Sequence, residues 1–191
     1  MTKKILILNG NPKANSYNQH LADLYELEAR ECNEVKRFDL ATLDFNPSLE
    51  SGYDSEQSVE ACLSVFQEAL LWAEHVVILT PVWWGGLPAK LKGLFDRTFL
   101  PGFAFRYSEG SIYPEQLLQG KTARLIITMD APEDFAREQA NPIIEQLDKF
   151  TLQFSGIEAA ELTLIGSIIM SNKEQRAAWD AVVGDLGKTG S

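Results

Sequence analysis

Residues 75–99 read HVVILTPVWWGGLPAKLKGLFDRTF, and this stretch decides the fold. Its first six residues form a mostly apolar run rich in β-branched side chains, which is typical of a buried parallel strand. Pro88 stands where the first turn of a helix tolerates proline, and leucine and phenylalanine recur after it at helical spacing. Residues 81–87 are therefore predicted to join a strand to a helix. In open α/β sheets, such loops at the carboxyl ends of strands form the ligand crevice.

The same alternation of strand and helix runs along the whole chain. The predicted strands are residues 3–9, 34–39, 75–80, 121–128 and 158–165, and the predicted helices are residues 18–31, 59–73, 89–99, 141–154 and 174–183. This order predicts an α/β fold with a doubly wound, five-stranded parallel sheet in the strand order 2-1-3-4-5. The loops at Gly10, Pro81 and Thr128 are then expected to converge on one edge of the sheet.

Three segments fall outside this alternation. Residues 40–57 mix proline, glycine, serine and acidic residues, and they are predicted to form a long excursion loop. Residues 103–113 are predicted to form a small hairpin or an ordered flap. The tail, residues 184–191, is expected to fray.

Length and charge limit the classes of partner. A chain of 191 residues fits a single domain, residues 1–191. The net charge of −10 argues against nucleic acid, because the phosphate backbone would be repelled. A bound phosphate would need backbone N–H groups and a few local donors for the same reason. No apolar run approaches the length of a signal-peptide core or a membrane span, so we expect a cytoplasmic protein without direct membrane insertion.

The cysteines and histidines give no indication of a metal site. Cys32 and Cys62 lack metal-ligand spacing and are expected to be reduced thiols. His20 falls within a predicted helix and His75 at the start of a predicted strand. Both histidines are expected to be structural rather than ligands.

The loop after the first predicted strand reads GNPKANS and is dense in turn-forming residues. It lacks both the dinucleotide-binding glycine fingerprint and the P-loop pattern. Polar residues nevertheless gather where the next helix should begin: Asn11, Lys13, Ser16, Tyr17 and Asn18. Exposed N–H groups and the helix dipole favour an anion at such a position. A phosphate site and a simple capped turn both explain this pattern.

The loop after the third predicted strand carries Trp83 and Trp84 followed by Gly85 and Gly86. Glycines let a backbone approach a flat ligand closely, while the indole rings can form walls. Two core tryptophans are the alternative, and the opposite directions of neighbouring strand side chains disfavour it. Residues 128–132 would add backbone donors from the next loop.

Two segments together resemble a known family. GNPKANSYNQHLA, residues 10–22, and PVWWGGLPAKLKGLFDRTFLPGFAFRY, residues 81–107, are similar to the NAD(P)H:quinone oxidoreductase family of flavodoxin-like flavoproteins. The resemblance spans about residues 3–128. It implies a flavin phosphate held near Asn11 by Ser16, Tyr17 and Asn18. It implies that the flavin ring is held by Pro81, Val82, Trp83, Trp84 and Gly85, with Thr128, Met129, Asp130 and Ala131 on the other side.

The resemblance also implies a reaction. The cofactor would be FMN, with FAD as the alternative, and it would accept hydride at N5 from NADH or NADPH. Two electrons would then pass to a quinone bound in the same place, which gives ping-pong kinetics. Backbone N–H groups near Trp84 and Gly85 would bond the N5 edge, so these two residues are the expected catalytic residues, with the Trp84 indole as a wall of the substrate cavity. Trp83 could instead point into the core.

The chain departs from the family at the loop after the fourth predicted strand. The family often has Thr-Thr-Gly-Gly there, whereas this chain has Thr128, Met129, Asp130 and Ala131. The Tyr and His that assist hydride transfer in mammalian members have no counterpart in residues 133–141. We therefore assign no acid–base pair.

The helix at residues 89–99 carries Lys90, Lys92 and Arg97, which we interpret as a solvated basic face. The resemblance implies a homodimer near this helix. Its candidate partner-facing side chains are Phe103, Phe105 and Tyr107. Two other functions remain open, namely a flavodoxin-like electron carrier and a flavin-binding regulatory subunit of a potassium-efflux system. The type of the first loop argues against the electron carrier.

Overall fold

The computed structural model describes residues 2–191 and contains one large parallel sheet. Its five strands lie in the order β2-β1-β3-β6-β7, which confirms the predicted order 2-1-3-4-5. The strands are β1 (Lys4–Asn9), β2 (Glu34–Asp39), β3 (His75–Pro81), β6 (Thr122–Thr128) and β7 (Glu161–Ile165). All neighbouring pairs are parallel, so the loops at their carboxyl ends meet at one edge.

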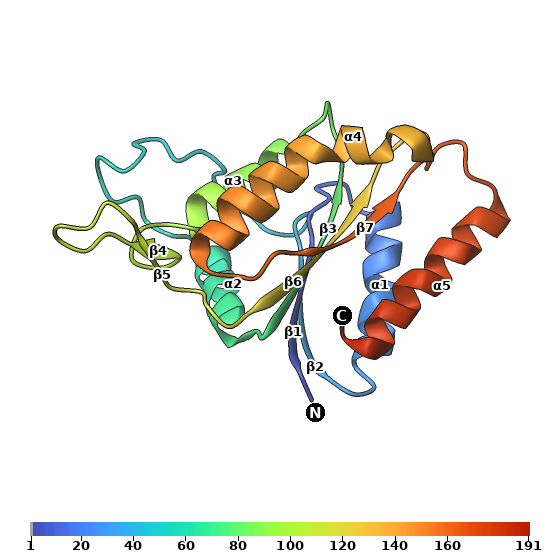
Figure 1. Cartoon of the computed structure of the whole chain (residues 1–191), viewed down its shortest axis with the longest axis horizontal. Helices are drawn as coiled ribbons and strands as arrows, with labels where there is room; N and C mark the ends of the chain where they lie inside the picture. The colour runs from blue at the N-terminus through green and yellow to red at the C-terminus, as the bar shows by residue number, and fades with distance from the viewer. Residues whose placement is uncertain (1) are drawn as a thin grey trace.

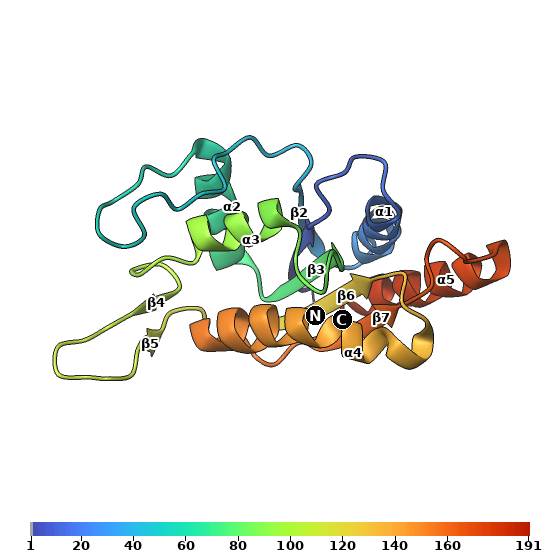
Figure 2. The same cartoon turned by 90° about the horizontal axis from the view of Figure 1, so that it is seen from above.

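Helices cover both faces of this sheet (Figures 1 and 2). One face is covered by α1 (Tyr17–Ala29) and α5 (Lys173–Thr189), which lie side by side in Figure 1. The other face is covered by α2 (Ala61–Trp72), α3 (Ala89–Thr98) and α4 (Glu133–Ile143). The molecule is therefore doubly wound, as the alternation of strands and helices predicts.

The apolar run of β1 shows why both faces are needed. Ile5 and Ile7 pack in the core against α1 and α5, whereas Leu6 and Leu8 pack in the core against the other three helices. All four side chains are inaccessible to solvent. Each such burial stabilises the fold by about 1.5–3 kcal/mol, so the continuous apolar strand ties the two helical layers together.

The structure corrects the prediction of a helix at residues 141–154. α4 begins at Glu133 and continues through a π-helix (Ile144–Leu152) and a 3-10 turn (Gln153–Ser155) before Gly156 ends it with φ of 101°. The sequence pattern missed the first turns because only the small residues Ala136 and Ala140 are buried there before Ile143. The last strand is also shorter than predicted, because it begins at Glu161.

The prediction of a frayed tail was wrong. α5 continues to Thr189, and Gly187 packs so closely on α1 that an added Cβ would lie 2.5 Å from the Tyr25 carbonyl oxygen. Tyr25 Oη donates to the Ser191 carbonyl at 3.2 Å, and Lys3 Nζ donates to the Gly190 carbonyl at 2.8 Å. These contacts with residues far away in sequence hold the C-terminal segment in place, although its composition is typical of a disordered tail.

The prediction that α3 has a solvated basic face was also wrong for Arg97. Arg97 is only 1% exposed, pairs with Glu60 at 2.8 Å and donates to the Ser58 carbonyl at 2.7 Å. Gly93 makes room for the same long loop, since an added Cβ would lie 2.4 Å from Pro47 Cβ. Residues 40–57 form the predicted excursion loop without helix or strand, held onto α3 by a buried guanidinium.

The remaining small elements agree with the sequence. β4 (Phe105–Arg106) and β5 (Glu115–Gln116) pair antiparallel, so the predicted hairpin is present and closes a few residues later than expected. His75 is buried, with Nδ1 2.7 Å from Thr122 Oγ1, and burial lowers its pKa to about 4. Both cysteines are free thiols. No helix within residues 2–191 is long and apolar enough to cross a membrane.

Candidate functional site

The loops after β1, β3 and β6 converge on a cavity of about 410 Å³ at the carboxyl edge of the sheet, which we call the loop cavity. It is lined by Asn11, Lys13, Asn15, Ser16, Tyr17, Asn18, Pro81, Val82, Trp83, Thr128, Met129, Asp130, Ile168, Ile169 and Arg176. The convergence predicted from the strand order is therefore present. Every predicted binding residue lines this cavity except Trp84, Gly85 and Ala131.

The first loop is built to present the start of α1. Ser16 is the N-cap, and its Oγ accepts the N–H of Gln19 at 3.2 Å. Asn15 takes a left-handed conformation with φ of 54°, which asparagine tolerates better than most residues. Gly10 lets the loop begin against β3, because an added Cβ would lie 3.0 Å from the Leu79 carbonyl oxygen. Ser16, Tyr17 and Asn18 at the start of α1 therefore line the loop cavity, where the first turn of a helix has free N–H groups.

Asn18 joins the first loop to the third. Its Oδ1 accepts from Thr128 Oγ1 at 2.9 Å and from Asn11 Nδ2 at 3.4 Å. Its Nδ2 is buried and has no acceptor within residues 2–191, although the whole side chain is only 3% exposed. A buried donor without a partner costs about 1–3 kcal/mol. This amide is therefore positioned to donate to a ligand.

Tyr17 connects the loop cavity to α5. Its hydroxyl donates to Asp180 Oδ1 at 3.0 Å, while His20 Nε2 lies 3.0 Å from the other carboxylate oxygen. Burial and the bond to Asp180 raise the pKa of the Tyr17 hydroxyl, so the group stays protonated. The hydroxyl bonds to Asp180, which does not line the loop cavity. Tyr17 therefore lines the cavity with its aromatic ring.

Arg176 is a cavity residue that the sequence patterns did not find. Its guanidinium lies 5.1 Å from the centre of the Tyr17 ring, and its Nε donates to Ser171 Oγ at 2.9 Å. The one signal in the sequence was the position of Arg176 near the start of α5. A cation there is unfavourable by itself, because it opposes the helix dipole. Lys13 and Arg176 are the cations that line this cavity, and Asp130 is its anion.

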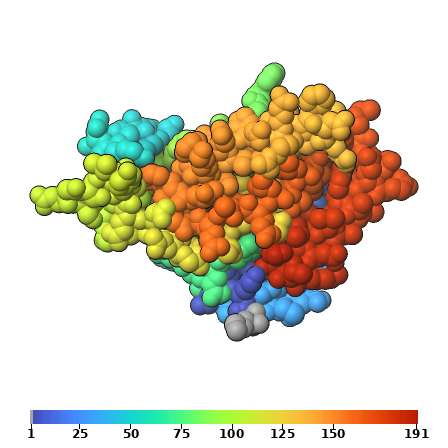
Figure 3. Space-filling model, in the orientation of Figure 1, coloured from blue at the N-terminus to red at the C-terminus, as the bar shows by residue number. Residues whose placement is uncertain are grey.

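The second loop closes as a tight turn. Trp83 and Gly86 exchange both backbone hydrogen bonds, at 3.0 and 2.9 Å, and the two residues between them have positive φ, 53° at Trp84 and 71° at Gly85. Such a turn favours glycine at these positions, so Trp84 is conformationally strained. Figure 3 shows this loop, in green, projecting from the surface.

The turn separates the two tryptophans. Trp83 is 45% exposed and lines the loop cavity, so the alternative that it points into the core is wrong. Trp84 is fully exposed at the tip of the turn and does not line the loop cavity, so its role as a wall of the substrate cavity stays a prediction. The difference arises because the left-handed backbone turns the second indole away from the sheet edge.

The third loop has no backbone conformation that requires the glycines that the family often has there. Within residues 2–191, positive φ outside glycine occurs at Asn15, Trp84 and Ser167, so Met129, Asp130 and Ala131 have ordinary backbone conformations. The segment after β7, which the sequence patterns did not assign to the site, supports this loop. Ser167 N–H donates to the Ala131 carbonyl at 2.9 Å, and Ile169 N–H donates to Asp130 Oδ1 at 2.9 Å.

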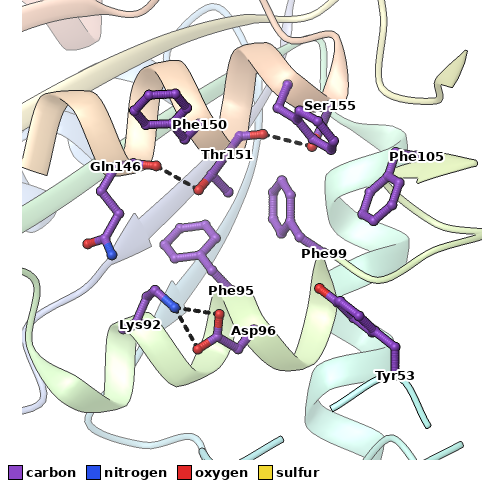
Figure 4. A pocket seen from close by; sticks show the side chains of 11 residues that line it. Tyr53, Lys92, Phe95, Asp96, Phe99, Phe105, Gln146, Phe150, Thr151 and Ser155 are labelled. Atoms are coloured by element: carbon purple, nitrogen blue, oxygen red, sulfur yellow. Dashed lines mark hydrogen bonds and ion pairs between the residues drawn. The ribbon is translucent and has the colours of Figure 1, made fainter. Parts of the chain in front are cut away.

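One further cavity adjoins these loops, and another lies elsewhere in the molecule. The α4 cavity, about 420 Å³, is lined by Gly85, Ala131, Phe135, Glu138, Gln139 and Pro142, and so contains two of the predicted residues absent from the loop cavity. The aromatic cavity, about 360 Å³, lies between α3 and the π-helix (Figure 4). Its rings include Phe95, Phe99, Phe105, Phe150 and Phe154. Phe105 packs edge-on against Phe154, with ring centres 5.2 Å apart.

A family model described as a flavodoxin-like fold matches residues 3–187. The chain belongs to this flavodoxin-like family. An uncharacterised NAD(P)H oxidoreductase of Haemophilus influenzae is 28% identical over 181 residues, covering 91% of this chain and 88% of that protein. NAD(P)H dehydrogenase [quinone] 1 of Rattus norvegicus is 27% identical over 192 residues, covering 87% of this chain and 69% of the rat protein.

A solved structure extends the likeness in three dimensions. The NAD(P)H:quinone oxidoreductase of Methanothermobacter marburgensis has a TM-score of 0.84 over the whole of both chains, at 18% identity. At that identity the match shows a similarity of fold alone. In flavodoxin-like proteins the ligand crevice lies where the strand order reverses, between β1 and β3. The loop cavity occupies that position here.

Proposed function

We propose that this chain is a flavin-dependent NAD(P)H oxidoreductase that passes two electrons to a quinone or a similar acceptor. The observation that carries the proposal is the buried Nδ2 of Asn18, which has no acceptor within residues 2–191 and belongs to a cavity built from three loops. The names of the relatives from Haemophilus influenzae and Rattus norvegicus support the same activity.

The residues present fit a flavin at its phosphate end. The N–H groups at the start of α1, the Asn18 amide and the guanidinium of Arg176 are suitable donors for a phosphate. They offset the repulsion expected from a chain with a net charge of −10. We favour FMN, and FAD, which would place the same phosphate and ring groups at these loops, is the alternative.

The other end of the loop cavity suits a flat ring. Pro81, Val82 and Trp83 would hold one side of it, and the third loop would hold the other. The N–H of Met129 is already donated to the Ile165 carbonyl at 2.9 Å, so Asp130 and Ala131 are the donors we assign to the third loop. A bound flavin would supply the hydride chemistry, and these residues would bind it and orient its ring.

The turn residues complete the assignment. The N–H groups of Trp84 and Gly85 take no part in the hydrogen bonds that close the turn, so they are suitable donors for the ring edge. Since nicotinamide and acceptor would use the same exposed face beside this turn, we expect them to bind in succession and give ping-pong kinetics.

The test is the absorption spectrum of the purified protein, followed by mass analysis of any released chromophore. We expect a flavin spectrum, or one that appears when FMN is added, and oxidation of NADH or NADPH that depends on a quinone. A colourless protein that binds neither FMN nor FAD would overturn the proposal.

We also infer a homodimer, because aromatic side chains remain exposed around the aromatic cavity. Phe150 is 62% exposed and Tyr107 is 59% exposed, although Phe105, a predicted contact, is partly covered by its own chain. Apolar surface of this density favours an interface. Light scattering at micromolar concentration should give twice the monomer mass, and a monomer would contradict the inference.

A further inference from the structure

The α4 cavity lies beside the turn of the second loop. Its floor comes from Gly85 and Ala131, one residue from each of the two loops proposed to hold the flavin ring. Within residues 2–191 no atom lies within 4 Å of a Cβ built on Gly85, so there is open space beside the turn. Figure 1 shows the loop after β3 rising beside α4.

One face of α4 forms the wall of this cavity. Phe135, Glu138, Gln139 and Pro142 follow one another at helical spacing and all line it. Ala136, Ala140 and Ile143 are buried on the neighbouring face of the helix, which fixes the rotation of α4 about its axis. Phe135 is 59% exposed and offers a flat apolar surface.

The wall carries one charged group, the carboxylate of Glu138. Within residues 2–191 this side chain makes neither a hydrogen bond nor an ion pair of its own, so its charge is not neutralised by a partner. Arg137 is next to it in sequence, but adjacent residues on a helix do not face each other. A ligand in this cavity therefore lies against an aromatic ring and one negative charge.

We propose that the α4 cavity receives the electron acceptor and that Glu138 selects against negatively charged acceptors. The favoured class is uncharged planar quinones, stacked on Phe135, and the disfavoured class is their sulfonated or carboxylated analogues. This inference rests on the proposed function, because the cavity adjoins the loops assigned to the flavin. Glu138 is a specificity-determining residue here and is assigned no part in hydride transfer.

The test compares 1,4-naphthoquinone with 1,2-naphthoquinone-4-sulfonate on flavin-loaded protein. Binding is measured first, without NAD(P)H, from the change in flavin absorption, and kcat/KM is measured second. Removing the charge in Glu138→Gln should tighten binding of the sulfonate about threefold to tenfold and change binding of the neutral quinone by less than about twofold, because a charge at a solvated surface acts over a few ångströms. High salt should reduce the difference.

Glu145→Gln is the matched control. Glu145 is exposed on the continuation of the same helix and lines none of the three cavities, so the same loss of charge should leave both quinones unaffected. Unchanged relative binding of the two quinones in Glu138→Gln, in a protein that reduces quinones, would overturn the inference alone. Failure of the wild-type protein to oxidise NAD(P)H with either quinone would overturn the proposed function and this inference with it.

Discussion

The two ends of the site differ in how they are held. At the start of α1, side chains from the first and third loops bond to one another, and Asn18 is buried with its oxygen satisfied by Thr128 and Asn11. At the turn after β3, Trp84 stands fully exposed on a backbone with φ of 53°. One end is organised before a ligand arrives. The other holds an apolar ring in water at a conformational cost.

The sharpest test of the organised end is Asn18→Asp, which keeps the acceptor oxygen and removes the Nδ2 donor. A lost hydrogen bond to a charged group, together with the added negative charge, should raise the Kd for FMN about a hundredfold, corresponding to about 3 kcal/mol. Titration of the apoprotein with FMN, followed by flavin fluorescence, measures this.

Thr128→Val is the matched control for that experiment. It removes one of the two bonds that hold Asn18 and leaves the donor in place, so the Kd should rise by only about threefold, the value of one neutral hydrogen bond of roughly 0.7 kcal/mol. If Asn18→Asp binds FMN as tightly as the wild type, the phosphate assignment is wrong.

Arg176→Gln tests whether α5 contributes to the same end. We expect the Kd for FMN to rise about tenfold, since one charged hydrogen bond to the phosphate is lost, and the Kd for riboflavin to stay unchanged because it has no phosphate. Calorimetry with both ligands measures this. Lys173→Gln, on the same helix but outside the loop cavity, should bind both ligands like the wild type. Equal weakening of riboflavin would show that Arg176 acts on the fold instead.

Trp84→Asn tests the exposed end and should have the smallest effect on the fold. Asparagine tolerates a left-handed backbone better than tryptophan and the indole has no packing to lose, so the free energy of unfolding should rise by up to about 1 kcal/mol. Quinone turnover should fall about fivefold if the indole covers the acceptor, since a stacked aromatic contact is worth about 1 kcal/mol. Denaturant titration and steady-state kinetics separate the two. Unchanged turnover and flavin retention would remove Trp84 from the site.

Much of this architecture could be predicted from local patterns. The apolar run of β3, the proline before α3 and the N-cap at Ser16 are signals within a few residues of one another. With the rules for doubly wound folds they predict the strand order, and that order predicts the convergence of three loops. The same locality explains the errors. The first turns of α4 bury only alanines before Ile143, and the end of α5 is ordered by contacts with Tyr25 and Lys3 far away in sequence.

The residues of the candidate site also divide into those that local patterns predict and those that they do not. The residues of the first loop and Trp83 could be predicted, because polar residues at a helix start and an aromatic pair before two glycines are informative by themselves. Arg176 and Ile169 could not, because nothing local links α5 to the first loop. The exposure of Trp84 depends on the left-handed turn, and a non-glycine residue there gave no warning of it.

The sequence by itself determined the periodicity of apolar residues, hence the strands, their winding and the edge at which the three loops meet. Only the tertiary structure decided which side chains meet there, which donors are already used and which way each tryptophan points. The physical reason is the distance along the sequence over which each kind of information is carried. Periodicity is written within a turn of helix or a few residues of strand, whereas the bond from Thr128 to Asn18 joins residues 110 positions apart and exists only once the sheet is assembled.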